Sequence, residues 1–326
     1  MNARTRVFLV VALAGAVAAV AAVGVTLLQT RGEQTTAPGA VTAPRKGVPP
    51  LQLDFGVRDD AETRALAQAA KLYAAGHRPQ AATIFARYHS LDAQIGAAFA
   101  SWPGHALDDL KRIVSAHPQS ALAELHLGLA YLWSGRDADA VASWRRANTV
   151  QPDSPSAVDA ETLLHPLYQP GLPFILTPLT PPVAVAKLPA AQQLAVLARN
   201  AARPDANAKL LYGVALWNLR RPISAERQFT AAAALAPHDP VALTAAAVGS
   251  FSKDKPVTAF SRLGPLTGVF PKAAVVRFHL GLLLIATRQL KKGETQLKLA
   301  IADNPKSIYA TQAEAFLAQI AKAGTR

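Results

Sequence analysis

The sequence predicts an all-α protein, built as a solenoid of antiparallel helix pairs behind one N-terminal transmembrane helix. Three observations lead to this prediction. Hydrophobic residues make up 51% of the 326 residues and aromatic residues only 6%, and this alanine-rich composition favours closely packed helices. Prolines recur at intervals of 34 residues, which indicates repeats. An uncharged segment near the N-terminus indicates the membrane helix.

Residues 7–28 carry no charge and, at about 1.5 Å per helical residue, can span a hydrocarbon core of about 30 Å. Arg4 and Arg6 precede this segment, so the positive-inside tendency places residues 1–6 in the cytoplasm and the rest outside. A cleaved signal peptide is the alternative, although its apolar region is usually only about 7–15 residues long. We therefore expect a single-pass protein of the cell membrane with extracytoplasmic repeats.

Residues 29–60 are rich in Thr, Pro, Gly, Gln and Ala and show no apolar period. Such a composition is typical of a flexible linker, which would hold the folded part away from the membrane.

The repeats begin at about residue 61. Pro118 and Pro152 are 34 residues apart, and so are Pro237, Pro271 and Pro305 in succession. A fixed period of this length is typical of a solenoid. Successive copies occupy 206–239, 240–273 and 274–307. The clearest copy, 121–154, has small and large residues at set positions: Leu127, Gly128, Tyr131, Gly135, Ala140, Trp144, Ala147 and Pro152.

This pattern resembles the tetratricopeptide-repeat (TPR) family, with Glu124 at the place of the usual opening Trp. Two helices pack closely only if small residues such as Gly128 and Ala140 stand where the backbones approach. The resemblance implies a right-handed superhelix in which the first helix of each pair lines a concave face. It also implies a role in binding other proteins.

The chain therefore divides into four parts after the linker. Between residues 166 and 189, seven prolines prevent a sustained helix, while apolar residues predict that residues 171–185 lie against the helices. The parts are N-terminal TPR-like helices (61–165), a Pro-rich apolar insert (166–189), C-terminal TPR repeats (190–307) and a capping helix (308–326).

Signatures of catalysis are missing from the sequence. It contains no cysteine, no glycine-rich phosphate loop, no G-x-S-x-G elbow and no H-E-x-x-H motif. No two of its eight histidines lie four residues apart, and the adjacent Asp108 and Asp109 would diverge around a helix. We expect no enzyme activity, no cofactor and no metal site.

The TPR resemblance implies which residues face a ligand. In this chain those positions are largely apolar, which differs from the Lys and Asn that clamp a peptide carboxylate in some members. Either a partner or the chain itself, through residues 171–185 or the C-terminal helix, would cover this face. The candidate groove residues are Leu125, His126, Leu129, Leu132, Trp133, Leu210, Val214, Trp217, Phe251, Phe278, His279 and Leu282.

The predicted function is a membrane-anchored scaffold or adaptor that binds protein partners in the cell envelope, with no specific nucleic acid. The alternative follows from the net charge of +13, because residues 190–326 hold 18 Lys and Arg against 7 Asp and Glu. Such a basic region attracts an anionic polymer or a lipid surface.

Overall fold

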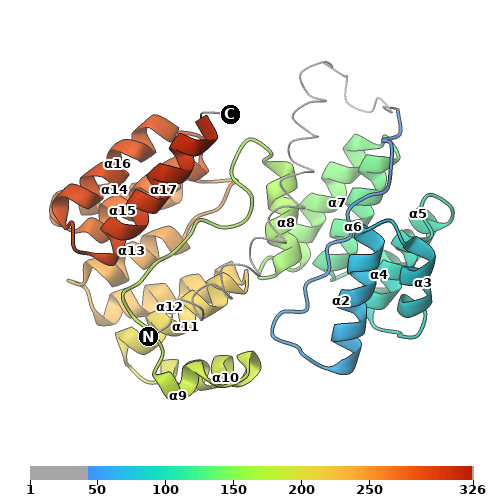
Figure 1. The fold of residues 1–326 in the computed structure, drawn as a ribbon, viewed down its shortest axis with the longest axis horizontal. Helices are drawn as coiled ribbons and strands as arrows, with labels where there is room; N and C mark the ends of the chain where they lie inside the picture. Colours follow the sequence, from blue (N-terminus) through green and yellow to red (C-terminus); the bar gives the residue numbers. More distant parts are fainter. Residues whose placement is uncertain (1–42, 325–326) are drawn as a thin grey trace. The chain divides into compact units, whose positions relative to one another are not determined.

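The structure is a computed structural model that describes residues 43–324. The chain forms two compact units, unit 1 ending at Pro166 and unit 2 beginning at Leu167. Every regular element of the described residues is a helix (Figure 1). The all-α class and the helix-pair organisation are therefore confirmed for this part of the chain.

The predicted transmembrane segment, residues 7–28, and the cytoplasmic residues 1–6 lie outside the described residues. Among the helices that are described, none combines the length and the apolar character needed to cross a membrane.

Unit 1 contains three consecutive helix pairs and one further helix. Gly76 and Gly135 end the first helix of a pair at φ values of +85° and +73°, a conformation that favours glycine. The helices are α2 (Ala61–Ala74), α3 (Arg78–Phe85), α4 (Leu91–Ala100), α5 (Ala106–Ala116), α6 (Ala121–Trp133), α7 (Asp137–Val150) and α8 (Pro155–Leu164).

Unit 2 also contains three pairs, which α10 precedes and α17 follows. Its last helix packs on both α15 and α16. The helices are α9 (Val183–Ala186), α10 (Ala190–Ala201), α11 (Ala206–Asn218), α12 (Pro222–Leu235), α13 (Pro240–Gly249), α14 (Val257–Val269), α15 (Ala274–Ala286), α16 (Leu290–Asp303) and α17 (Ile308–Gly324).

Glycines set how closely the paired helices approach. A Cβ atom added to Gly128 of α6 would lie 2.3 Å from the indole nitrogen of Trp144 on α7, so the ring packs directly on the glycine backbone. In the last pair, Gly293 stands at the repeat position that Ala140 occupies in the clearest copy. A Cβ there would lie 2.8 Å from the Gly281 carbonyl oxygen, so α15 and α16 pack backbone to backbone.

Glu124 occupies the position where the TPR pattern usually opens with Trp. The residue is buried, and its Oε1 accepts a hydrogen bond from Arg146 Nε at 2.7 Å. An ion pair between α6 and α7 thus replaces an apolar contact, and the buried carboxylate has the charged partner that it needs.

The structure differs from the predicted flexible linker over residues 29–60. Residues 43–58, here called strap 1, form an extended segment in contact with the helices of unit 1, and Figure 1 shows it in blue. The physical reason is that its apolar side chains recur between prolines and polar residues such as Gln52 and Asp54. Val48, Leu51, Leu53 and Phe55 pack against the unit 1 core, and this burial outweighs the cost of ordering the segment.

The Pro-rich insert, 166–189, has two parts. Residues 167–180, here called strap 2, are extended, and Leu172, Ile175, Leu176 and Leu179 belong to or pack against the unit 2 core. Residues 181–185 are mostly exposed, so the prediction that the segment lies against the helices fails there, and this part includes the single helical turn α9. One turn fits because no proline occurs between residues 182 and 189.

Candidate peptide-binding grooves

Strap 1 lies against α2 and α6, each the first helix of a pair in unit 1, and its main chain holds it there by hydrogen bonds. In two of its hydrogen bonds, a main-chain group of the strap pairs with a buried side chain of α2 or α6. In the third, two main-chain groups pair. The bonds run from the Arg45 N–H to the Trp133 carbonyl (2.9 Å), from the Tyr73 hydroxyl to the Pro49 carbonyl (2.7 Å) and from the Gln52 N–H to His126 Nε2 (3.1 Å).

Strap 2 is held in unit 2 by bonds of the same kinds, and by one further bond from a buried lysine. The other donors again come from the first helix of a pair or from the strap itself, whereas the lysine lies in the segment between α13 and α14. The bonds run from the Gln169 N–H to the Ala286 carbonyl (2.9 Å), from Trp217 Nε1–H to the Pro173 carbonyl (2.7 Å), from the Leu176 N–H to His279 Nε2 (3.0 Å) and from Lys253 Nζ to the Gly171 carbonyl (2.7 Å).

His126 and His279 act as hydrogen-bond acceptors toward the straps. Each Nδ1 lies 2.7–2.8 Å from the carbonyl oxygen four residues earlier, on Leu122 or Val275. Since a carbonyl only accepts, Nδ1 carries the proton and Nε2 is free to accept the strap N–H. Burial lowers the pKa of both imidazoles to about 4, so both rings are neutral at pH 7.

One part of the unit 2 groove remains open beside strap 2. It is a pocket of about 380 Å³, in the size range of small-molecule sites. Phe174 of the strap, 42% exposed, lies at its edge with its ring 6.2 Å from that of Phe316. The remaining lining is mainly apolar and comes from strap 2, the segment after α13, and helices α15 and α17.

In unit 1, the residue that makes the corresponding main-chain bond is Trp133. Its side chain is buried, and the Arg45 guanidinium lies 5.7 Å from the ring centroid. Unit 2 has Ala286 and Gln169 in the positions that make the same main-chain bond. The pocket in unit 2 is thus lined by a small side chain, Ala286, at the position where unit 1 has an indole.

The structure places six of the twelve candidate groove residues at a strap or at the pocket: His126, Trp133, Trp217, Phe251, His279 and Leu282. Five others are buried in the helix cores: Leu125, Leu129, Leu132, Leu210 and Phe278. Val214 is partly buried. In each unit, a strap of the chain itself thus lies against part of the predicted groove face.

Sequence reasoning missed strap 1 and the residues that hold the straps by their polar groups, Tyr73 and Lys253. A signal for strap 1 exists in the sequence. Residues 47–51 read G-V-P-P-L and residues 171–175 read G-L-P-F-I, so the same pattern of glycine, aliphatic, proline, any residue and aliphatic occurs twice.

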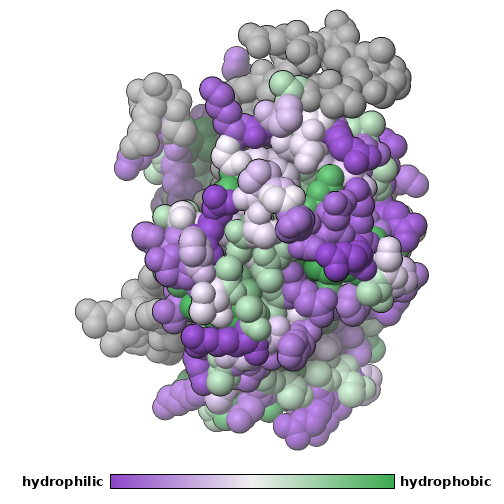
Figure 2. Space-filling model, turned by 90° about the vertical axis from the view of Figure 1, so that its right-hand side faces the viewer, coloured by the Kyte–Doolittle hydropathy of each residue, from purple (hydrophilic) through white to green (hydrophobic). Residues whose placement is uncertain are grey.

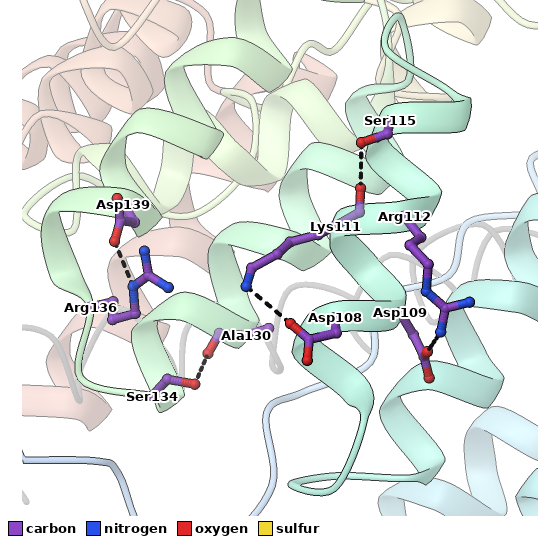
Figure 3. A network of polar contacts seen from close by, with 9 residues as sticks. All are labelled: Asp108, Asp109, Lys111, Arg112, Ser115, Ala130, Ser134, Arg136 and Asp139. Carbon is purple, nitrogen blue, oxygen red and sulfur yellow. Dashed lines mark hydrogen bonds and ion pairs between the residues drawn. The ribbon is translucent and has the colours of Figure 1, made fainter.

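The outer helices of unit 1 present an ordinary solvated surface. Asp108 and Asp109 each pair with a cation three residues later on α5, Lys111 at 3.0 Å and Arg112, so the two carboxylates point to different partners (Figure 3). Figure 2 shows the side that carries α3, α4 and α5 in Figure 1, where hydrophilic side chains surround a smaller apolar strip. Within residues 43–324, no three His, Asp or Glu side chains are grouped as metal ligands.

Two solved structures serve as examples of what this chain is similar to. One is a crystal structure of the APC/C hetero-tetramer Cut9-Hcn1, with 15% identity, a TM-score of 0.32, and coverage of 76% of this chain and 54% of the matched chain. The other is the C-terminal part of a TPR repeat-containing protein from Cytophaga hutchinsonii, with 13% identity, a TM-score of 0.26, and coverage of 76% and 98%.

The chain thus spans about half of the first of these matched chains. With TM-scores this low, neither structure bears on the function of this chain. No protein-family model matches the sequence, and no curated protein matches it either.

Proposed function

We propose that the chain is a non-enzymatic, membrane-anchored scaffold that binds a protein partner in the cell envelope. The observation that carries this proposal is that each unit holds an extended segment in a groove between its helices. The groove binds carbonyl and N–H groups of the segment by hydrogen bonds and its alternate side chains by apolar contact. This is the chemistry by which proteins recognise extended peptides.

The open pocket beside strap 2 is where the partner docks in this proposal. Its volume and apolar lining suit one large apolar side chain, and the residue that corresponds to Ala286 in unit 1 is a buried tryptophan, Trp133. A buried aromatic anchor of this kind dominates the binding energy of many protein interfaces.

Two features support a role without catalysis. Both ring nitrogens of His126 and of His279 are engaged in hydrogen bonds, and the rings are buried under the straps. The carboxylates of Asp108 and Asp109 each have their own cation. None of these groups is placed to exchange a proton with a substrate.

The docking site is tested by site-specific photo-crosslinking in native membranes. Gln319 of α17 is exposed and lines the pocket, whereas Thr295 of α16 is exposed and does not. A photo-reactive residue at position 319 should give a discrete protein adduct, and one at 295 should not. Ala286→Trp should fill the pocket and reduce the adduct at 319 at least about tenfold. An adduct that forms equally well in the Ala286→Trp chain would contradict this site.

The same membranes test the topology, in which the repeats lie outside the cell. Arg4, Arg6 and the uncharged residues 7–28 suggest this orientation. Protease added outside intact spheroplasts should digest the repeats and leave residues 7–28 in the membrane. Protected repeats would show that the orientation is reversed.

Salt dependence separates the scaffold from the alternative, an anionic polymer or lipid surface bound by the basic residues of 190–326. Binding through an apolar pocket should change little between 50 and 200 mM salt. A loss of several hundred-fold over that range, with no effect of Ala286→Trp, would favour the anionic ligand.

A further inference from the structure

The two straps are bound in the same register. The strap residues Arg45, Pro49 and Gln52 become Gln169, Pro173 and Leu176 when 124 is added to each number. His126 and Trp133 of α6 become His279 and Ala286 of α15 when 153 is added. Two separate segments therefore make three hydrogen bonds of the same type at the same spacing, which unrelated straps would not do.

The backbone conformation repeats as well. Gly47 and Gly171, again 124 residues apart, have φ values of +81° and +72°, and Pro49 and Pro173 are both buried. In the helices, the sequence H-L-G-L occurs at 126–129 and again at 279–282. The likeness thus extends from the bound segment to the groove that binds it.

Each position of the shared pattern has a physical role in the groove. The glycine supplies a left-handed turn that other residues rarely adopt. The proline has no N–H to satisfy in an apolar groove, and its carbonyl accepts the bond from Tyr73 or Trp217. The next residue faces outward, as the exposure of Phe174 shows. The final aliphatic residue packs on the core, as Ile175 does with 4% exposure.

We infer that both grooves are copies of one recognition site, whose ligand class is an extended segment with the pattern glycine, aliphatic residue, proline, any residue, aliphatic residue. Each groove accepts the strap of the other. A second step rests on the proposed function: the envelope partner carries such a segment, and this segment takes the place of strap 2 in unit 2.

The covalent link of strap 2 to its own unit sets the condition for this exchange. A short tether gives a bound segment an effective concentration in the millimolar range. A free peptide with the same contacts therefore competes poorly. A partner that also fills the pocket beside strap 2 has contacts that strap 2 lacks, and these give it the advantage that it needs.

The first experiment exchanges the straps in the full-length chain and requires no partner. Residues 169–177, QPGLPFILT, are replaced by RKGVPPLQL, the sequence of residues 45–53. The control chain carries the same nine residues in reverse order. We expect the exchanged chain to melt within about 4 °C of the wild type and the reversed chain to melt well below it. Equal destabilisation of both chains would overturn the equivalence of the grooves.

The second experiment offers the segment in trans. Ile175→Asp places a carboxylate in the buried position and should release strap 2. Capped peptides of residues 43–56 and 167–180 should then bind the Ile175→Asp chain saturably, at least tenfold more tightly than the wild type. A 167–180 peptide with the same Ile-to-Asp change should not bind. If neither unmodified peptide binds, or only the 167–180 peptide does, the ligand class is wrong.

The outcomes separate this inference from the proposed function. Successful strap exchange without any adduct at position 319 would leave the recognition site standing and remove the envelope partner. An adduct at 319 with failed exchange would do the opposite. Dimers of the wild-type chain that disappear on adding the 167–180 peptide would identify a second copy as the occupant, against the partner segment proposed here.

Discussion

The two buried histidines make the stability of the protein depend on pH in a defined window. Each imidazole has a pKa of about 4 in the folded chain, because burial penalises the cation, against 6.5 for a free histidine. Between these values the unfolded chain binds a proton that the folded chain does not. The stability that the neutral ring contributes is therefore complete above pH 6.5 and is lost as the pH falls toward 4.

The size of the effect follows from the same values. The difference between 6.5 and about 4 corresponds to about 3 kcal/mol for each histidine, and most of it is lost by pH 4.5. Protonation of Nε2 would also place a donor against the N–H of Gln52 or Leu176, so strap release should accompany the loss.

The measurement is urea unfolding of the full-length chain in detergent micelles at pH 7 and pH 4.5. His126→Gln keeps an acceptor for the strap N–H but cannot titrate, so its unfolding free energy should fall by about 2–3 kcal/mol less than that of the wild type over this range. His279→Gln should behave in the same way. His238→Gln, at an exposed position, is the matched control.

The reasoning is refuted if His126→Gln and His279→Gln show the same pH dependence as the wild type. Carboxylates titrate in the same range, but they are common to all of these chains and cancel in the comparison. Hydrogen exchange at the amides of Gln52 and Leu176 should rise at pH 4.5 relative to helix-core amides only in chains that retain the corresponding histidine.

Further predictions concern packing and the straps. Gly128→Ala should cost about 1–3 kcal/mol in thermal unfolding, because the new methyl group meets the buried ring of Trp144, whereas Gly268→Ala, with open space around it, should stabilise by about 0.5–1 kcal/mol. Equal effects would show that the helix pairs have another register. Tyr73→Phe should cost about 1 kcal/mol and speed exchange in strap 1, and Trp217→Phe should cost more, since a cavity adds to the lost donor. Unchanged exchange in both straps would remove these bonds from the explanation.

The helix pairs were predictable because their signals are local. The prolines that end second helices and small residues such as Gly128 affect neighbours within one repeat. The same residue types recur at these positions in the other repeats. His126 and His279 are each the sixth residue of their repeats, 121–154 and 274–307, and this likeness was visible in the sequence for the same reason. Their role was not, because it depends on strap residues 74 and 103 positions away.

The burial of strap 1 could not be predicted from local sequence signals. Both straps are rich in proline and lack a helical period, yet one was predicted to be solvated and the other to be buried. The prediction for residues 171–185 rested on their run of large apolar side chains, whereas in strap 1 these alternate with polar residues such as Gln52 and Asp54. Only the groove, formed by distant helices, determines that alternate residues of such a segment are buried.

The binding of strap 1 also limits the reach of the protein. A chain extends by at most about 3.5 Å per residue, so a free linker of residues 29–60 would let the repeats stand up to about 110 Å from the end of the proposed membrane helix. Because strap 1 fixes residues 43–58 to the helices, only residues 29–42 remain as a connection, and that limit falls to about 50 Å. Release of strap 1 would more than double the distance at which a partner could be met.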